Sequence, residues 1–161
     1  VDAVLPLVER ELRFETRLTI VGREREGANL TRFRDHSRIT ILGEVANTVP
    51  LYEGHRVFVA PTRYAAGVPY KVHEAASFGL PVVATELLRA QLGWENRQGL
   101  LSADASEPEE FARCIVALYR SEKLWTAIRD GAAETVRNAC AADAYQQVIA
   151  HVLDAAGNGL L

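Results

Sequence analysis

The run Ala66-Gly67-Val68-Pro69-Tyr70-Lys71-Val72-His73-Glu74-Ala75-Ala76-Ser77-Phe78-Gly79 lies between two apolar segments, residues 57–60 and 81–84. Gly67 removes a side chain where a ligand could approach the backbone, and Pro69 suits a first helical turn. The run therefore predicts a glycine loop that follows a strand and opens a helix. The free N–H groups and the positive dipole end of such a helix form an anion site.

Lys71 and Glu74 are the charged residues that the loop and helix present together. The three-and-four spacing places them on one helical face with Ala75 and Phe78. Lys71 lies one turn into the helix and can reach a phosphate, and Glu74 offers two acceptor oxygens to the paired hydroxyls of a ribose. The spacing predicts a site for a diphosphate and a sugar, but it also fits a simple surface ion pair between Lys71 and Glu74.

Short apolar runs at residues 18–21, 39–42, 57–60, 81–84 and, more weakly, 99–101 predict the strands. The first four runs are almost continuously apolar, which is typical of parallel strands covered on both faces. The segments between them are long enough for helical crossovers. This alternation predicts a Rossmann-like, doubly wound α/β fold with a parallel sheet flanked by helices.

The beginning of the sequence lacks a strand, because residues 1–10 predict a helix despite Pro6. A doubly wound domain normally opens with a strand that becomes central, so we expect the fold to begin one element late. Either the strands at 18–21 and 57–60 then pair directly, or another chain covers the gap. Exposed strand edges recruit partners, so we expect self-association through them.

The last third of the chain predicts helices. Ser106-Glu107-Pro108-Glu109 matches a capping box, and a second helix starts at Ser121. A third helix carries a stripe of apolar side chains, namely Tyr145, Val148, Ile149, Val152 and Leu153. We describe residues 1–161 as a single domain, with an α/β core over 1–105 and a helical section over 106–161.

Composition narrows the function classes. The net charge of −3 over 161 residues does not support a broad nucleic-acid footprint, so we expect no nucleic-acid partner. A local group of arginines could meet phosphates or a membrane surface, or could form a solvated surface; it comprises Arg23, Arg25, Arg32, Arg34 and Arg38. No apolar run is long enough to span a bilayer and no signal-peptide pattern occurs, so we expect a cytoplasmic protein, peripheral to the membrane in its full-length form.

Single residues outside the loop and helix add little chemistry. We expect Cys114 and Cys140 to be reduced and partly buried, because their spacing fits neither a metal site nor a disulfide framework. His73 points away from the face of Lys71 and Glu74, which favours a packing or surface role. Trp94 is interpreted as a packing residue.

Residues 57–85, V-F-V-A-P-T-R-Y-A-A-G-V-P-Y-K-V-H-E-A-A-S-F-G-L-P-V-V-A-T, resemble the donor-binding signature of retaining glycosyltransferases with two Rossmann domains, the GT-B architecture (glycosyl transferases group 1, family 4-like). The resemblance continues through L-T-I-V-G at 18–22, I-T-I-L-G-E-V at 39–45, G-L-L-S-A-D at 99–104 and E-P-E-E-F-A at 107–112. It covers residues 1–138.

The resemblance implies roles for individual residues. Glu74 would bind the ribose hydroxyls of a nucleotide-sugar, and Lys71 would stabilise the departing diphosphate as the catalytic residue. Backbone N–H groups of the loop would contact the diphosphate or the sugar. The remaining donor-binding positions are Gly67, Val68 and Pro69 in the loop, Ala66 where many members carry a glutamate, and Gly22, Arg23, Glu44 and Val45 after the first two strands.

The resemblance also implies an activity. It indicates the C-terminal, donor-binding half of a retaining enzyme that transfers a hexose-type sugar from a UDP- or GDP-sugar to an acceptor, without a cofactor. The sequence contains no Asp-x-Asp pair, so Lys71, the loop amides and Arg23 would supply the charge stabilisation without a metal. The N-terminal acceptor-binding domain of the family is missing from this chain, so we expect the isolated chain to be inactive.

Two other functions stay open at this point. The chain could be a catalytically inactive, stand-alone nucleotide-binding or interaction module of the same fold. A nucleotide-sugar epimerase on this architecture would need catalytic carboxylates beyond Glu74, and no pattern in the sequence identifies them.

Overall fold

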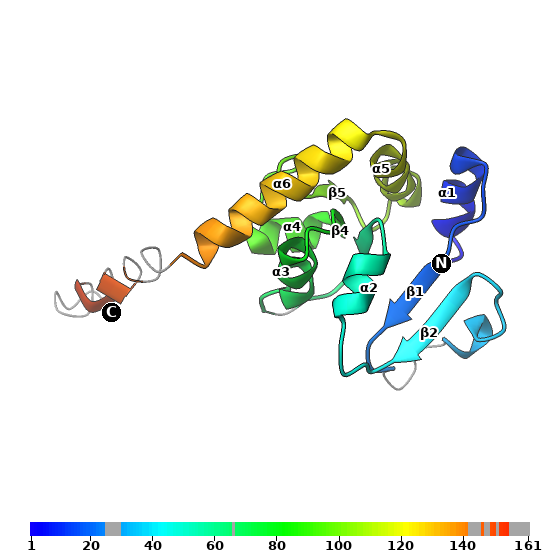
Figure 1. Ribbon diagram of the computed structural model, residues 1–161, viewed down its shortest axis with the longest axis horizontal. Coiled ribbons are helices and arrows are strands. Elements are labelled where there is room, and N and C mark those ends of the chain that lie inside the picture. The colour runs from blue at the N-terminus through cyan, green and yellow to red at the C-terminus, as the bar shows by residue number, and fades with distance from the viewer. Residues whose placement is uncertain (25–29, 66, 142–145, 147–148, 151, 155–161) are drawn as a thin grey trace.

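The computed structural model describes residues 1–24, 30–65, 67–141, 146, 149–150 and 152–154. Figure 1 shows their arrangement as strands with helices packed around them. The helices are α1 (Leu5–Leu12), the 3-10 turn η1 (Thr31–Phe33), α2 (Val49–Gly54), α3 (Tyr70–Ser77), α4 (Glu86–Leu92), α5 (Pro108–Arg120) and α6 (Glu122–Ala139). The strands are β1 (Leu18–Val21), β2 (Ile39–Gly43), β3 (Phe58–Ala60), β4 (Val82–Thr85) and β5 (Leu101–Ala103).

All strand pairs are parallel, as the apolar runs predict. Strands β1 and β2 form one sheet, and β3, β4 and β5 form a second sheet in that order. The fifth strand begins two residues later than the run at 99–101. Its first part belongs instead to a turn, in which the Arg97 amide donates to the Leu100 carbonyl at 2.7 Å.

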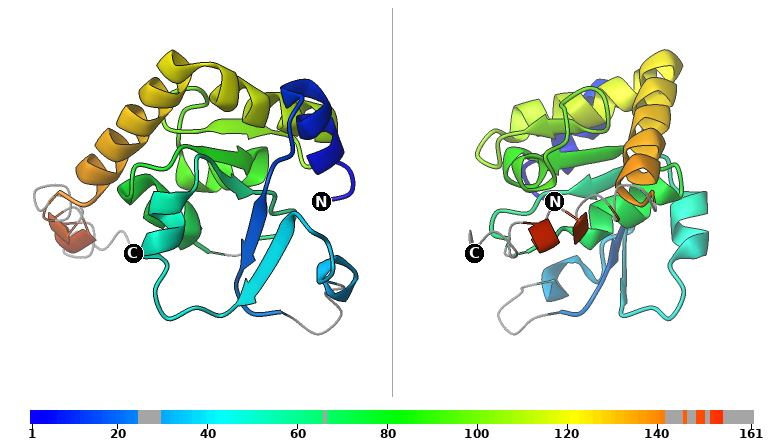
Figure 2. Two further views of the ribbon diagram at one scale, coloured as in Figure 1. Left: turned by 45° about the vertical axis from the view of Figure 1, so that its right-hand side comes forward. Right: turned by 90° about the vertical axis from the view of Figure 1, so that its left-hand side faces the viewer.

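Of the two alternatives predicted for the missing first strand, direct pairing of β1 with β3 is not formed in the part of the chain that the structure describes, and cover by another chain stays a prediction. The strands of the two sheets run in clearly different directions, so these edges cannot share one ladder (Figure 2). A side chain links them instead: His55 follows α2, and its Nε2 lies 2.8 Å from the Thr19 hydroxyl in β1. The Nδ1 of the same ring lies 2.6 Å from the Leu51 carbonyl oxygen.

Strand β4 is the centre of the hydrophobic core, because all four of its residues are buried. Val82 and Ala84 pack with residues of α3, α4 and α6, whereas Val83 packs with residues of β5, α5 and α6. Helices therefore cover both faces of the three-stranded sheet, which explains the continuous apolar pattern at 81–84. Helix α5 packs on β4 and β5, and α6 packs on α3 and α5, so residues 108–139 contribute to the same core as the three-stranded sheet.

Helix α1 forms as predicted and packs on α5 through Val8, which meets Ala112 and Val116. Its Glu9 carboxylate ties the two-stranded sheet to the helix. One oxygen accepts from the Thr16 amide at 3.2 Å, and the other pairs with Arg38 at the start of β2. Both side chains of this ion pair are largely shielded from solvent, so α1 acts as the anchor for β1 and β2.

The predicted capping box at the start of α5 is wrong. The Ser106 amide and hydroxyl both donate to Asp104 at 2.8 and 2.6 Å, so this serine closes a local turn instead of capping the helix. Helix α5 begins at Pro108 with Glu107 as an N-cap that makes no side-chain bond. The prediction at Ser121 is confirmed, because its hydroxyl accepts from the Leu124 amide at 3.1 Å.

The C-terminal predictions are only partly described. Tyr145 and Val148 lie outside the described residues, whereas Ile149, Val152 and Leu153 are helical and exposed. Cys114 is half-buried as predicted, but Cys140 is exposed because it lies just past the end of α6. Among the described residues, no helix is long and apolar enough to cross a bilayer.

Candidate functional site

The loop between β3 and α3 has the backbone geometry that its glycine predicts. Gly67 has φ +81°, a conformation that side-chain-bearing residues adopt only with strain. A β-carbon added there would meet no atom within 4 Å, so the space beside the loop is open. Val68 is 59% exposed beside it. Ala66 lies outside the described residues.

The start of α3 offers fewer backbone donors than the sequence suggests. The Tyr70 amide donates to the Val68 carbonyl and the Val72 amide to the Pro69 carbonyl, both at 2.9 Å. Pro69 is the N-cap of α3 and has no N–H, so it cannot contribute the amide predicted for it. The candidates that remain for an anion are the amides of Gly67, Val68 and Lys71.

Lys71 extends back over the ends of β3 and β4. Its ammonium group donates to the Thr62 hydroxyl at 2.7 Å, and the Thr62 carbonyl accepts from the buried Thr85 hydroxyl at 2.8 Å. Burial lowers the pKa of Lys71 below its ordinary value. No carboxylate among the described residues pairs with Lys71, so the alternative of a surface ion pair with Glu74 is wrong.

Glu74 is exposed and is contacted from α2. The Thr48 hydroxyl donates to its Oε1 at 2.9 Å, and the Tyr52 hydroxyl lies close enough for the charge of Glu74 to raise the pKa of the phenol. The sequence did not predict these two contacts, because α2 carries no recognisable motif and Thr48 lies 26 positions from Glu74. The Tyr52 ring stacks on the Phe78 ring with centroids 5.1 Å apart, which holds Tyr52 beside α3.

The buried face of α3 differs in one residue from the prediction. Ala75 is fully buried with Val72 and Ala76 and does not share the exposed face of Lys71 and Glu74. The buried face of α3 packs against Val82 and Ala84 of β4. The predicted packing role of His73 is confirmed, because its ring meets buried Trp94 edge-on at 5.4 Å.

The residues predicted after β1 and β2 lie together in a second group. The Arg23 Nε donates to the Glu44 carboxylate at 3.1 Å, and both side chains are mostly exposed. The Gly22 amide donates to the Gly43 carbonyl at 2.8 Å, and Val45 is half-buried beside them. No hydrogen bond or ion pair within the described ranges joins this group to Lys71 or Glu74.

The local arginine group is a paired surface. Arg32 pairs with Asp2, Arg34 with Glu24, and Arg38 with Glu9, as Arg23 does with Glu44. Arg25 lies outside the described residues. The positive charges of the described arginines are therefore balanced locally, which favours the solvated-surface interpretation over a phosphate or membrane surface.

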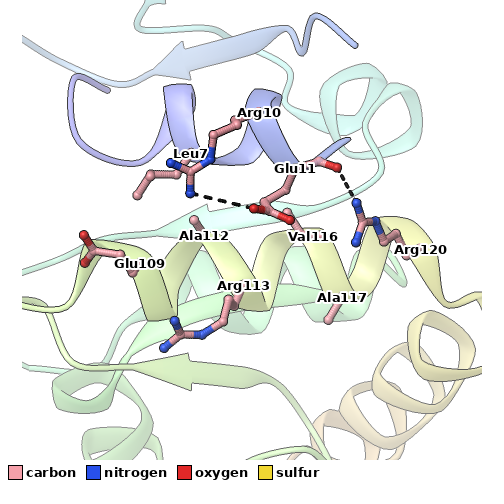
Figure 3. Close-up of a pocket in the computed structure, with 9 residues that line it drawn as sticks. All are labelled: Leu7, Arg10, Glu11, Glu109, Ala112, Arg113, Val116, Ala117 and Arg120. Carbon is pink, nitrogen blue, oxygen red and sulfur yellow. Dashed lines mark hydrogen bonds and ion pairs between the residues drawn. The ribbon is translucent and has the colours of Figure 1, made fainter. Parts of the chain in front are cut away.

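Two hollows lie elsewhere on the surface. The first, of about 370 Å³, is a groove between α1 and α5 with an apolar floor of Leu7, Ala112 and Val116 and a rim of charged side chains (Figure 3). The second, of about 390 Å³, lies at the carboxyl ends of β3, β4 and β5. Arg63, Thr85 and Asp104 line it, and the sequence analysis missed them although they closely follow or end predicted strands.

The carboxyl ends of parallel strands are where open α/β sheets bind ligands, so the Lys71 loop and the second hollow lie at the expected edge. No cluster of three or more possible metal-ligating side chains occurs in the described part of the chain.

The family described as glycosyl transferases group 1 matches residues 1–121. This chain belongs to that family. A comparison with curated proteins found no match. The glycosyltransferase family assignment predicted from residues 57–85 is confirmed.

Solved structures confirm the fold of this glycosyltransferase domain. A glycosyltransferase from Rickettsia africae ESF-5 superposes with a TM-score of 0.71 at 16% identity, over 84% of this chain and 38% of that chain. HepE (Alr3699) from Anabaena, solved in complex with UDP, gives 0.74 at 18% identity over 93% and 44%. WaaG, a glycosyltransferase involved in lipopolysaccharide biosynthesis, gives 0.67 at 15% identity over 84% and 38%. The chain therefore spans less than half the length of each structure.

Proposed function

We propose that this glycosyltransferase domain binds a nucleoside-diphosphate sugar at the Gly67 loop and α3. The observation that carries the proposal is the ammonium group of Lys71. It lies at the start of α3, four residues after the open space at Gly67, a hydroxyl is its hydrogen-bond partner, and although the residue is exposed, partial burial lowers its pKa. A desolvated cation of this kind attracts a phosphate more strongly than a solvated one.

In the full-length protein, the domain takes part in transfer of a hexose-type sugar from a UDP- or GDP-sugar with retention of configuration. Lys71 and the loop amides stabilise the negative charge that develops on the leaving diphosphate, without a metal or a cofactor. Glu74 accepts hydrogen bonds from the ribose hydroxyls, and Arg23 reaches the phosphates after leaving Glu44. An exposed ion pair contributes little to stability, so this exchange costs little.

The acceptor binds to an N-terminal domain outside residues 1–161. The lengths of the similar structures support this division, because each is more than twice as long as the segment that this chain covers. We further propose a cytoplasmic location, peripheral to the membrane in the full-length protein, and self-association through the open edges of β1 and β3.

Calorimetric titration of the purified chain with UDP, GDP and ADP, with and without EDTA, tests the donor site. We expect one of the diphosphates to bind equally well in EDTA, and we expect Lys71→Ala to weaken it tenfold or more, about 1.4 kcal/mol. Lys123→Ala is the matched control, because it removes the exposed lysine of α6. Unchanged affinity in Lys71→Ala with native circular dichroism would contradict the role of Lys71.

A further inference from the structure

Helix α2 reaches across to Glu74 with two hydroxyl groups. Thr48 is the N-cap residue of α2, a position where a threonine hydroxyl ordinarily accepts from an amide of its own helix. Its hydroxyl makes no such bond and donates instead to the Glu74 Oε1 at 2.9 Å. The Asn47 side chain accepts from the amide of Val49, the first residue of α2, at 3.0 Å. The Thr48 hydroxyl is therefore committed to Glu74 rather than to its helix.

The Tyr52 ring is held between two aromatic neighbours. Its ring stacks on Phe78 at an interplanar angle of 10° and meets Phe58 at a centroid distance of 6.0 Å. Burial, followed by the charge and hydrogen bond of Glu74, raises the pKa of Tyr52 to about 12. The phenol therefore keeps its proton throughout the neutral pH range and lies beside the Glu74 carboxylate.

The two hydroxyls leave part of the carboxylate available. An ionised carboxylate has about four acceptor positions; Thr48 occupies one of them, and the Tyr52 phenol lies beside the same carboxylate. Glu74 is exposed, so the other positions face solvent. A glutamate held at one side by the Thr48 hydroxyl and bounded by the stacked Tyr52 ring loses rotamer freedom before a ligand arrives, which lowers the entropy cost of binding.

We propose that Thr48 and Tyr52 are positioning residues that orient Glu74 toward the vicinal hydroxyls of the ligand's ribose and so make the site selective for a ribonucleoside diphosphate. This inference rests on the proposed function, because Glu74 must be the group that meets the ribose. Neither hydroxyl touches the ligand; both act through the carboxylate.

The experiment takes whichever of UDP, GDP and ADP binds best and compares its binding with that of its 2′,3′-dideoxy analogue. The measured quantity is the dissociation constant of the dideoxy analogue divided by that of the nucleoside diphosphate. We expect Tyr52→Phe and Thr48→Val each to lower this ratio about fivefold, the loss typical of one hydrogen bond, while affinity for the dideoxy analogue is unchanged. Thr48→Ser keeps the hydroxyl and should retain the ratio. Tyr119→Phe removes a phenol from α5 as the control.

Each outcome distinguishes the inference from the function on which it rests. If the wild-type ratio is large and Glu74→Gln lowers it, but Tyr52→Phe and Thr48→Val do not, the positioning role is wrong and the ribose contact of Glu74 stands. Equal weakening of both ligands in these variants, which a merely structural role would produce, also overturns the inference. A wild-type chain that binds both ligands equally, or neither, overturns the ribose contact of Glu74 and the inference with it.

Discussion

The backbone of Gly131 in α6 lies directly against the carbonyl group of Gln98. A β-carbon added to Gly131 would be 2.1 Å from the Gln98 oxygen and 3.0 Å from the Gln98 carbonyl carbon. Backbone atoms cannot rotate away as a side chain can, so the glycine is required by contact between α6 and the turn before β5. This close approach holds α6 against the turn that leads into the three-stranded sheet.

Gly131→Ala should destabilise the protein although alanine is the better helix former. The propensity gain of about 1 kcal/mol is outweighed by displacement of the Gln98 backbone, and we expect a net loss of about 1–3 kcal/mol in urea unfolding. Gly54→Ala in α2 is the matched control, because a β-carbon there meets nothing within 4 Å. Equal stability of Gly131→Ala and the wild type would show that α6 is not packed this tightly.

Lys71→Met should leave the free protein at least as stable as the wild type at pH 7. The pKa of Lys71 is lower in the folded state than in the unfolded chain, so folding disfavours its protonated form. The resulting loss of folding stability is complete below the folded-state pKa of Lys71, and it disappears as pH rises toward the pKa of the unfolded chain. Melting temperatures at pH 7 measure this effect on stability without ligand, and the same series with the diphosphate that binds best measures the effect on ligand binding.

In the same measurement, the ligand should raise the melting temperature of the wild type but not of Lys71→Met. Lys123→Met should behave as the wild type in both conditions. A Lys71→Met variant that is less stable without ligand would mean that the bond to Thr62 outweighs the desolvation of the ammonium group.

Tyr52 should be the last described tyrosine to ionise. Its pKa of about 12 predicts a late phase in the alkaline absorbance titration of the five tyrosines, and Tyr52→Phe should lack this phase. Glu74→Gln should move the phase only part of the way to the ordinary value, because burial is the largest cause of the shift. A late phase that survives in Tyr52→Phe would assign it to another tyrosine.

The same shift predicts a pH-dependent stability. The unfolded chain loses the Tyr52 proton near pH 10 and the folded chain near pH 12, so the folded state binds more protons between these values. The stability that the raised pKa contributes is complete below pH 10 and is lost as pH rises to 12. The difference in unfolding free energy between the wild type and Tyr52→Phe should decline across this window.

The two serines near helix starts should respond differently to replacement. Ser121→Ala removes the bond to the Leu124 amide and should cost about 1 kcal/mol of unfolding free energy. Ser106→Ala removes only an exposed bond to Asp104 and should cost less than half as much. Chemical denaturation of both variants measures the difference, and a larger loss in Ser106→Ala would restore the capping-box interpretation.

The strands could be predicted from the sequence because a strand buried on both faces, such as β4, appears as a continuous apolar run. The predicted start of β5 is two residues too early, because the hydrogen bond between Arg97 and Leu100 places the beginning of the apolar run at 99–101 in a turn. Lys71 and Glu74 were recognisable because loop, helix and charge lie within one short segment. Their assignment as ligand-binding residues stays a prediction.

The neighbours of these two residues could not be predicted in the same way. Thr48 and Tyr52 meet Glu74 only after α2 and α3 pack side by side, and no local pattern encodes that contact. The capping box failed at Ser106 for a related reason, because an aspartate two residues earlier competes for the same hydroxyl. Local propensity thus located the elements, whereas tertiary contacts decided which partners their polar groups found.

The separation of the two sheets has a consequence for cooperativity. Among the strands that the structure describes, β1 forms a ladder with β2 alone, and the links from this pair to the rest of the chain include the Glu9–Arg38 ion pair and the His55–Thr19 hydrogen bond. The β4 ladder is flanked on both sides and fully buried. Amide protons of β1 and β2 should therefore exchange with solvent deuterium through partial opening, whereas those of β4 should exchange only through global unfolding.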